Sequence, residues 1–321
     1  MIPAAGQHGG DGARLAAALG VAPSEILDLS ASLNPFAPDI APIVNRHLES
    51  IGRYPDPEPA RSALAEAIGV PSNELLLTNG GSEAIALCCD ELVRRYGSAS
   101  LRPHDFSLYA RHLAIVNEHG PRVCSNPGNP TGRLLDVTSG LDEDGTPVGI
   151  WDEAFWPLAA GTWTSGAHRN GPMVLGSLTK LFACPGLRLG YVLADPDTIA
   201  VLEKRQPQWA VGTLAADVVP DLLKLADLPG WASGITHRRN KLAAVLHSYG
   251  YDTIPGVNWL LVTKAGQTGS DIRSALATRR VLVRDCTSFG LPQYVRIAIP
   301  SDNNFTKLER SLELSNSEVD R

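Results

Sequence analysis

The chain has 321 residues, 44% of them apolar, and a formal net charge of −6. This balance predicts a globular protein with a sizeable core. It argues against a nucleic-acid-binding surface, which requires a basic face. No apolar run approaches the roughly 20 residues that span a bilayer, so we expect no membrane segment. The spacing of the five cysteines is typical of neither a zinc site nor a disulfide framework, which favours a cytoplasmic location without a metal.

The N-terminal part of the chain is expected to form an arm. One short helix is predicted over residues 11–20, followed by an extended path rich in Asn, Pro and Ser. Apolar residues at helical spacing predict a second helix from Ala60. The segment LLLTNGGSEAIALCCDELVRRYG is then the first clear α/β unit. It predicts a strand from Leu75 to Thr78, a glycine turn and a helix that Ser82 caps.

Four further apolar segments predict short strands that end in polar or Gly-rich loops. They are PRVCS, PVGIWD, MVLGSLTK and RLGYVLAD. Strands that are apolar throughout are typical of a mostly parallel sheet, which carries its site at the carboxyl ends of the strands. We therefore expect the chemistry of this protein in the loops that follow these segments.

The pattern changes after Pro196. Helices are predicted at 197–206, 214–225, 236–250 and 270–280, and strands at 258–264, 281–286 and 294–300. This arrangement is typical of a small α+β domain. We expect residues 1–50 to form an arm that belongs to the small domain and its substrate pocket. Residues 51–205 would then form a large domain, and residues 206–321 an interdomain helix with the small C-terminal domain.

Three polar features lie where the predicted strands end. The turn before Ser82 offers backbone N–H groups at a helix N-terminus, which suits an anion. Asn129 lies in the loop NPGNPTG. Asp152 ends an apolar strand, where a carboxylate is unfavourable unless a positive group pairs with it. Taken singly, each feature is more often a turn, a cap or a loop start than a binding site.

The segment GSLTKLFACPGLRLGY contains a single lysine, Lys180. Ser177 precedes it by three residues and Arg188 follows it by eight. A lysine at a strand end is often merely solvated. A lysine whose pKa is lowered by burial or by nearby positive charge can instead form a covalent bond with a carbonyl group of a cofactor.

The order NPGNPTG, DEAF, SLTK and then arginine resembles the fold-type I pyridoxal-phosphate enzymes of the class I/II aminotransferase superfamily. The resemblance implies an α/β fold, with a mostly parallel sheet in a large domain and a small α+β C-terminal domain. It implies that Lys180 binds pyridoxal 5'-phosphate covalently and that Asp152 pairs with the pyridine nitrogen of the cofactor. Asn129 would hydrogen-bond the phenolic oxygen. These three are the expected catalytic residues.

The same resemblance implies further cofactor contacts. The phosphate would be held by Gly81, Ser82, Ser177 and Arg188, and Phe106 in HDFSLY would stack on the ring. Tyr54 in RYPD would reach the phosphate in a neighbouring subunit, which implies a homodimer. The chain is short between Gly80 and Asp152, so we expect a shortened large domain with one strand fewer.

Three other stretches resemble the L-threonine-O-3-phosphate decarboxylase family of cobalamin biosynthesis. They are HGGDGARLAAALG with ILDLSASLNPFAP, SLTKLFACPGLRLGY, and VLVRDCTSFGL with YVRIAIP. The implied reaction gives (R)-1-aminopropan-2-yl phosphate from L-threonine O-3-phosphate. Arg284, Arg296, Asn34 and His8 would bind this small anionic amino acid. Two alternatives stay open, namely an aminotransferase similar to the histidinol-phosphate aminotransferases, and a pyridoxal-phosphate-binding protein without catalytic activity.

Overall fold

The computed structural model describes residues 2–319, with side chains through residue 314. The contacts divide this chain into a large unit, residues 37–129 and 133–232, and a small unit, residues 2–36, 130–132 and 233–319. We expected changes of domain near residues 50 and 205, but the units change at residues 36 and 232. The reason is that residues 41–50 pack on helix α9 (Thr213–Leu223), where Arg46 donates to the Asp221 carboxylate at 3.2 Å and His47 Nε2 lies 3.1 Å from it.

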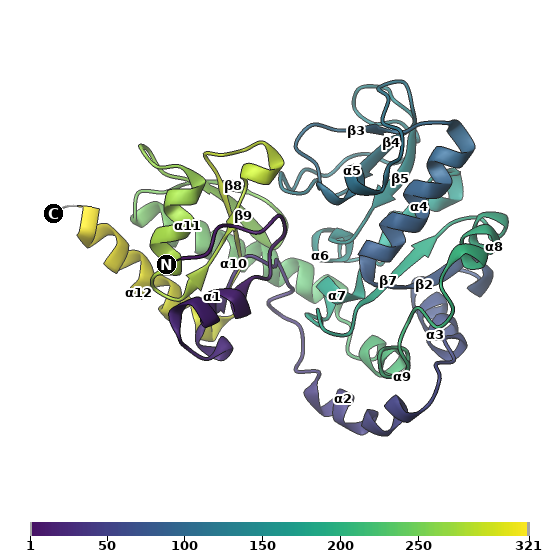
Figure 1. The fold of residues 1–321 in the computed structure, drawn as a ribbon, viewed down its shortest axis with the longest axis horizontal. Coiled ribbons are helices and arrows are strands. Elements are labelled where there is room, and N and C mark those ends of the chain that lie inside the picture. Colours follow the sequence, from purple (N-terminus) through teal and green to yellow (C-terminus); the bar gives the residue numbers. More distant parts are fainter. Residues whose placement is uncertain (1, 320–321) are drawn as a thin grey trace. The chain divides into compact units, whose positions relative to one another are not determined.

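The large unit is built on a six-stranded sheet in the order β2-β7-β6-β5-β4-β3 (Figure 1). Strand β7 is antiparallel to both of its neighbours, and the other strands share one direction. The expected mostly parallel α/β sheet is therefore confirmed. The strands are β2 (Leu75–Asn79), β3 (Ser100–Leu101), β4 (Arg122–Ser125), β5 (Val148–Asp152), β6 (Met173–Gly176) and β7 (Leu189–Leu193).

The part of the large unit before β5 is compact. Edge strand β3 has two residues, and the helix that follows it, α5 (Leu108–His112), has five. Residues 126–147, which connect β4 to β5, form turns and loops. Arg122 on β4 anchors this connection, because its guanidinium lies 3.2 Å from the buried carboxylate of Asp142.

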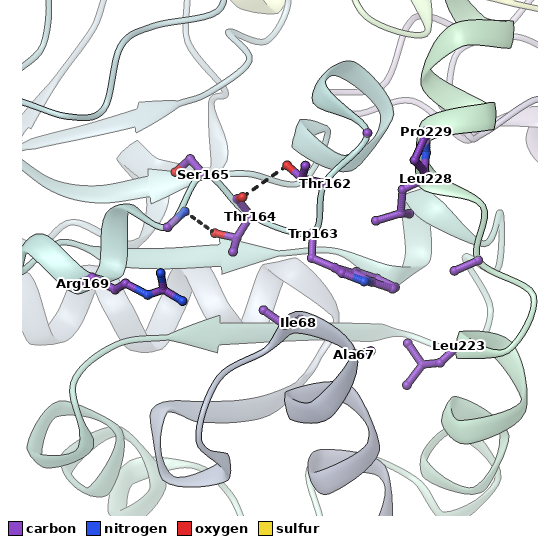
Figure 2. Close-up of a pocket in the computed structure, with 13 residues that line it drawn as sticks. Ala67, Ile68, Thr162, Trp163, Thr164, Ser165, Arg169, Leu223, Leu228 and Pro229 are labelled. Carbon is purple, nitrogen blue, oxygen red and sulfur yellow. Dashed lines mark hydrogen bonds between the residues drawn. The ribbon is translucent and has the colours of Figure 1, made fainter.

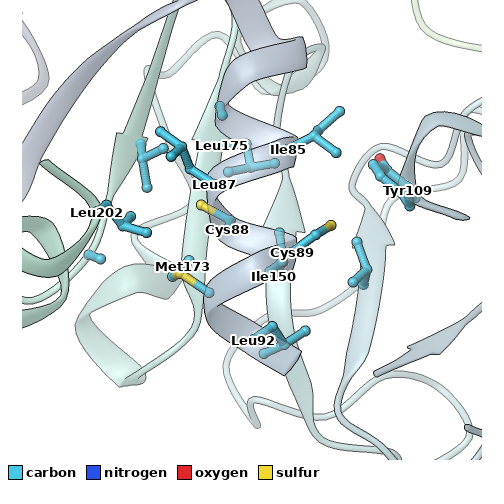
Figure 3. Close-up of a cluster of buried hydrophobic side chains, with 14 of the residues drawn as sticks. Ile85, Leu87, Cys88, Cys89, Leu92, Tyr109, Ile150, Met173, Leu175 and Leu202 are labelled. Carbon is cyan, nitrogen blue, oxygen red and sulfur yellow. The ribbon is translucent and has the colours of Figure 1, made fainter. Parts of the chain in front are cut away.

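Helix α4 (Gly80–Tyr96) covers one face of the sheet (Figure 3). Its apolar residues recur at helical spacing, so Ile85, Cys88 and Leu92 point to the same side. They pack against Ile150 of β5 and Met173 of β6 in a cluster of fully buried side chains. Tyr96 and Gly97 end the helix, with Gly97 in the left-handed conformation that glycine adopts most readily.

The remaining helices of the large unit lie around this sheet. They are α2 (Ala41–Arg46), α3 (Glu58–Ile68), α6 (Trp156–Ala160), α7 (Leu178–Leu181), α8 (Pro196–Arg205) and α9. Asp195 caps α8 by accepting the N–H of Thr198 at 2.9 Å. Among the helices of residues 2–319, none is both long and apolar enough to cross a membrane.

The small unit carries an antiparallel sheet in the order β11-β12-β9-β8 and a parallel pair, β1 with β10. Its strands are β1 (Leu27–Asp28), β8 (Asp252–Pro255), β9 (Trp259–Thr263), β10 (Val281–Leu282), β11 (Arg284–Asp285) and β12 (Val295–Ala298). Its helices are α1 (Gly12–Leu19), α11 (Gly269–Ala277) and α12 (Asp302–Val319), and α10 (Leu228–Ser248) begins in the large unit.

We expect Leu92→Ala to lower the free energy of unfolding by about 3 kcal/mol, because it removes buried methyl groups and leaves a cavity under α4. Urea denaturation measures the change. Arg94→Ala on the exposed side of the same helix is the control and should leave the free energy of unfolding nearly unchanged, because an exposed ion pair contributes little. Equal effects of the two variants would contradict the assignment of this core.

Candidate active site

Asp152 lies at the carboxyl end of β5 and is only 9% exposed. Its carboxylate accepts the N–H of Ala154 at 3.0 Å and the hydroxyl of Tyr109 at 2.8 Å. Burial raises the pKa of this carboxyl to about 6, although both hydrogen bonds and the nearby charge of Lys180 lower it. A buried carboxylate with this pKa would be stabilised by any cation that approaches it.

Tyr109 on α5 is a member of this cluster that the sequence analysis missed. Burial raises its pKa well above the usual value, so it remains a hydroxyl that donates to Asp152. Its ring meets that of Phe106 edge to face, with 5.7 Å between the centroids. The predicted site residue Phe106 is therefore joined to Asp152 through Tyr109. The signal in the sequence was the spacing of one helical turn between the two aromatic residues of HDFSLY.

Asn129 follows β4, the neighbour of β5. Ser125 at the end of β4 pairs in register with Asp152. The hydroxyl of Ser125 accepts the backbone N–H of Asn129 at 2.8 Å and itself donates to Asp105. Asp105, which the sequence analysis also missed, thus fixes the start of the loop that carries Asn129. Both strand ends meet at the edge of the sheet where we expected the site.

Lys180 lies in the single turn of helix α7, not at the end of a strand as we expected. Strand β6 ends at Gly176, and Ser177 starts the turn. The turn forms because the hydroxyl of Thr179 binds the backbone of Leu189 as both donor and acceptor, at 3.0 and 3.1 Å. The Lys180 ammonium lies 5.8 Å from the centre of the Phe155 ring.

Arg188 lies against the N-terminus of α4. A Cβ on Gly80 would come within 2.5 Å of its guanidinium, so a larger residue there would displace the Arg188 side chain from this position. The backbone of Arg188 has a φ of 54° and that of Gly80 a φ of 73°. Ser82 lies in the first helical turn rather than at the N-cap, because α4 begins at Gly80 and Glu83 accepts the N–H of Asn79 at 2.6 Å. Strand pairing brings Gly81 and Arg188 to the same edge.

Tyr54 has a different environment from these residues. Its side chain is 76% exposed, and its ring packs on that of Trp209 with 4.6 Å between the centroids. Ile51, just before it, is also exposed. All three are therefore exposed apolar side chains of the large unit.

The small unit contains the four residues expected to bind substrate. Arg284 on β11 and Arg296 on β12 face each other in antiparallel register. Both are nearly fully buried, at 3% and 5% exposure. Burial lowers the pKa of both, that of Arg296 to about 10, and the charge of Arg284 lowers the pKa of Arg296 further. Two guanidinium groups directly opposite on a sheet repel each other, which an anion would relieve.

The N-terminal arm lies along these strands. Arg284 donates from Nη1 to the Gly6 carbonyl at 2.6 Å and also to the carbonyl of Gln7. His8 therefore lies beside Arg284, and both line a small pocket with Ser30. Asn34 is buried further along the arm, where its Oδ1 accepts the N–H of Phe36 at 3.0 Å.

A separate pocket of about 700 Å³ lies in the large unit between the C-terminal ends of α3 and α9 and the loop 161–166 (Figure 2). Trp163 and Leu223 point into it, and Arg169 lies at its rim. Its lining includes none of the predicted site residues.

The sequence and the fold of this chain are similar to those of known proteins. Residues 123–312 match the family described as Aminotransferase class I and II. Threonine-phosphate decarboxylase of Salmonella typhimurium is 30% identical, over 92% of each chain. Histidinol-phosphate aminotransferase 1 of Nitrosococcus oceani is 24% identical, over 89% of this chain and 87% of that one. The structure of histidinol-phosphate aminotransferase from Sinorhizobium meliloti in complex with pyridoxal-5'-phosphate has a TM-score of 0.81 at 16% identity, over 99% of this chain and 96% of that one.

The chain belongs to the aminotransferase class I and II family. This family is pyridoxal-phosphate-dependent and has the fold-type I architecture, as the sequence motifs predicted. The resemblance to threonine-phosphate decarboxylase is likewise confirmed at the level of sequence similarity.

We expect Asp152→Asn to stabilise the cofactor-free protein at about pH 8 and not at about pH 4. The folded pKa of about 6 exceeds the unfolded value near 3.9, so wild-type stability is present below about pH 4 and is lost as the pH rises through about 6. The amide carries no charge and avoids this loss, a gain of about 3 kcal/mol. Urea denaturation at both pH values measures it, and an unchanged midpoint at pH 8 would contradict the raised pKa.

Proposed function

We propose that this protein decarboxylates L-threonine O-3-phosphate with pyridoxal 5'-phosphate as its cofactor. The observation that carries the proposal is the pair of buried arginines, Arg284 and Arg296, opposite each other on the small sheet. A substrate with a phosphate and a carboxylate supplies an anion for each guanidinium, and arginine suits both by its paired donors. Similarity to the Salmonella decarboxylase supports the same substrate.

The residues of the large unit fit the cofactor. Burial keeps the pKa of Asp152 raised despite the charge of Lys180, and a protonated pyridine nitrogen would stabilise the ionised carboxylate further. Lys180, whose charge acts on Asp152, would bind the cofactor covalently. Asn129 would hydrogen-bond its phenolic oxygen, and Phe106 would stack on its ring. Pyridoxal phosphate, when bound, supplies an electron sink for a bond broken at Cα.

A phosphate fits at the N-terminus of α4. Gly80 has no side chain there, the first N–H groups of a 17-residue helix point outward, and the guanidinium of Arg188 lies against Gly80. We propose that Gly81, Ser82, Ser177 and Arg188 hold the cofactor phosphate. The positive φ of Arg188 supports this role, because such backbone strain is commonly kept at binding sites.

In the proposed reaction the bond from Cα to the carboxylate breaks and carbon dioxide leaves. A proton takes its place at Cα, and the product is (R)-1-aminopropan-2-yl phosphate, a building block for cobalamin. Arg284 and Arg296 would orient the substrate by its two anionic groups, with Asn34 and His8 beside them. An aminotransferase would instead break the Cα–H bond, and the similarity to a histidinol-phosphate aminotransferase makes this the second candidate.

We expect the holoenzyme to absorb visible light and to release carbon dioxide from L-threonine O-3-phosphate. Lys180→Ala should lose both properties, because the covalent attachment of the cofactor is lost. Lys264→Ala is the control. The ammonium of Lys264 lies over the ring of Tyr251 in the small unit, so this variant should keep both properties. Absorption spectra and carbon dioxide detection measure the two effects.

Three results would count against parts of this proposal. A visible band with no carbon dioxide, but with amino transfer from histidinol phosphate to a 2-oxoacid, would favour the aminotransferase. A band without either reaction would favour a non-catalytic cofactor-binding protein. Failure to bind added pyridoxal phosphate would overturn the cofactor assignment.

We also propose that the protein is a homodimer in which Tyr54 reaches the cofactor phosphate of the neighbouring subunit. The exposed surface of Ile51, Tyr54 and Trp209 supports a covered interface. The five cysteines all lie within the described residues as buried free thiols, which supports the cytoplasmic location that we propose.

We expect Ile51→Glu to shift the protein from dimer to monomer and to weaken pyridoxal phosphate binding, because a charge would have to be buried in the interface. Sedimentation equilibrium and cofactor titration measure the two changes. Leu314→Glu, at an exposed position of the small unit, is the control. A wild-type protein that sediments as a monomer would contradict the proposal.

A further inference from the structure

One aromatic ring in the small unit contacts both buried arginines. The guanidinium carbon of Arg284 lies 5.4 Å from the centre of the Phe289 ring, and that of Arg296 lies 6.0 Å from the same centre. Arg296 also lies 5.2 Å from the centre of the Trp259 ring. Phe289 and Trp259 are both buried. The two guanidinium groups are therefore held against a shared aromatic surface.

The sequence after Arg284 builds this contact locally. Asp285 accepts the N–H of Thr287 at 2.8 Å and starts a single turn, η5 (Thr287–Phe289), which Gly290 ends with a φ of 75°. Within this turn the hydroxyl of Ser288 accepts a hydrogen bond from Arg284 at 2.6 Å. The chain thus folds back on Arg284 and holds it by a hydroxyl and by the adjacent ring.

Trp259 fixes the second arginine in a similar way. Its indole Nε1 donates to the carbonyl of Pro130 at 2.7 Å, so the ring has one orientation. Arg296, stacked on that ring, donates from Nη2 to the Ser30 carbonyl at 3.2 Å.

An aromatic ring is a different partner from a carboxylate. It attracts a guanidinium through its quadrupole and adds no negative charge, so the arginine keeps its full positive charge for a ligand. The contacts of Arg284 with Gly6, Gln7 and Ser288 are also to neutral oxygen atoms. Fixed cations with retained charge discriminate between ligands by the separation of the anions they must meet.

We propose that Phe289 is a positioning residue that sets the separation of the Arg284 and Arg296 guanidinium groups, and thereby selects amino acids by the distance between their phosphate and carboxylate groups. This inference rests on the proposed function, since it assigns one anionic group of the substrate to each arginine. Phe289 itself takes no part in the bond-breaking step.

The test compares substrates that differ in this distance. L-Threonine and L-serine O-phosphates have the same number of bonds between phosphate and carboxylate, and L-homoserine O-phosphate has one methylene more. In the wild-type holoenzyme we expect the first two to be preferred. Phe289→Leu keeps an apolar side chain and removes the ring. It should raise KM for L-threonine O-3-phosphate about tenfold, equivalent to about 1.4 kcal/mol, with a smaller change in kcat, and reduce the preference over the homoserine compound.

Two variants separate positioning from general stability. Phe305→Leu removes another buried ring of the small unit, one that lies 4.4 Å from the ammonium of Lys241. It should lower the melting temperature and leave KM and the substrate preference unchanged. Phe289→Tyr keeps the aromatic face and should restore the preference lost in Phe289→Leu. Should Phe289→Leu fail to fold, Phe289→Met takes its place, because its flexible side chain fills the same space without a ring.

The inference is overturned if Phe289→Leu lowers only the melting temperature, as Phe305→Leu does, or if Phe289→Tyr loses the preference as fully as the leucine variant. These results differ from failure of the proposed function. A wild-type holoenzyme that neither binds nor turns over any of the three compounds overturns both, whereas an active wild type with an unaltered preference in Phe289→Leu overturns the positioning role alone.

Discussion

The burial of the Asp152 carboxylate is the constraint on which the large unit depends. A charge in a low-dielectric interior is unfavourable unless donors and a counter-charge surround it. The turn after β5 supplies the N–H of Ala154, and α5 supplies the hydroxyl of Tyr109. These groups leave the pKa raised to about 6, so part of the desolvation penalty remains in the protein alone. The large unit is thus built to gain stability when a cation reaches this position.

The neighbouring carboxylate, that of Glu153, is a buried charge whose hydrogen bonds hold a loop in place. It is also buried, but the side chains of Thr164 and Ser165 and the N–H of Ser165 all donate to it. These bonds fix the loop that carries Trp163 into the pocket of Figure 2. Burial still raises the pKa of Glu153, while its donors come from one adjacent loop. The two successive carboxylates therefore differ in their donors, which come from α5 and the turn after β5 for Asp152 and from a single loop for Glu153.

The sequence predicted what depends on local order. Asp152 and Lys180 were predicted as site residues because each lies in a short motif that follows an apolar run; Asp152 does end strand β5, whereas Lys180 lies in helix α7, just after β6. Tyr109 was missed because its partner, Asp152, is 43 residues away and only the folded sheet brings them together. The antiparallel direction of β7 was not predictable either, since a strand buried on both faces has the same apolar pattern in either direction. The domain boundaries differ from the expected ones for a similar reason, because Arg46 and His47 contact Asp221, which is distant in the sequence.

The small unit buries a pair of positive charges. Arg284 and Arg296 are buried face to face, and rings and neutral oxygen atoms, rather than carboxylates, contribute much of their surroundings. Neutral partners hold the guanidinium groups in place without neutralising them. Each unit therefore retains a desolvated charge that a ligand of the opposite sign would relieve. Because such a ligand binds the folded chain and not the unfolded one, its binding free energy adds to the stability of the unit that it contacts.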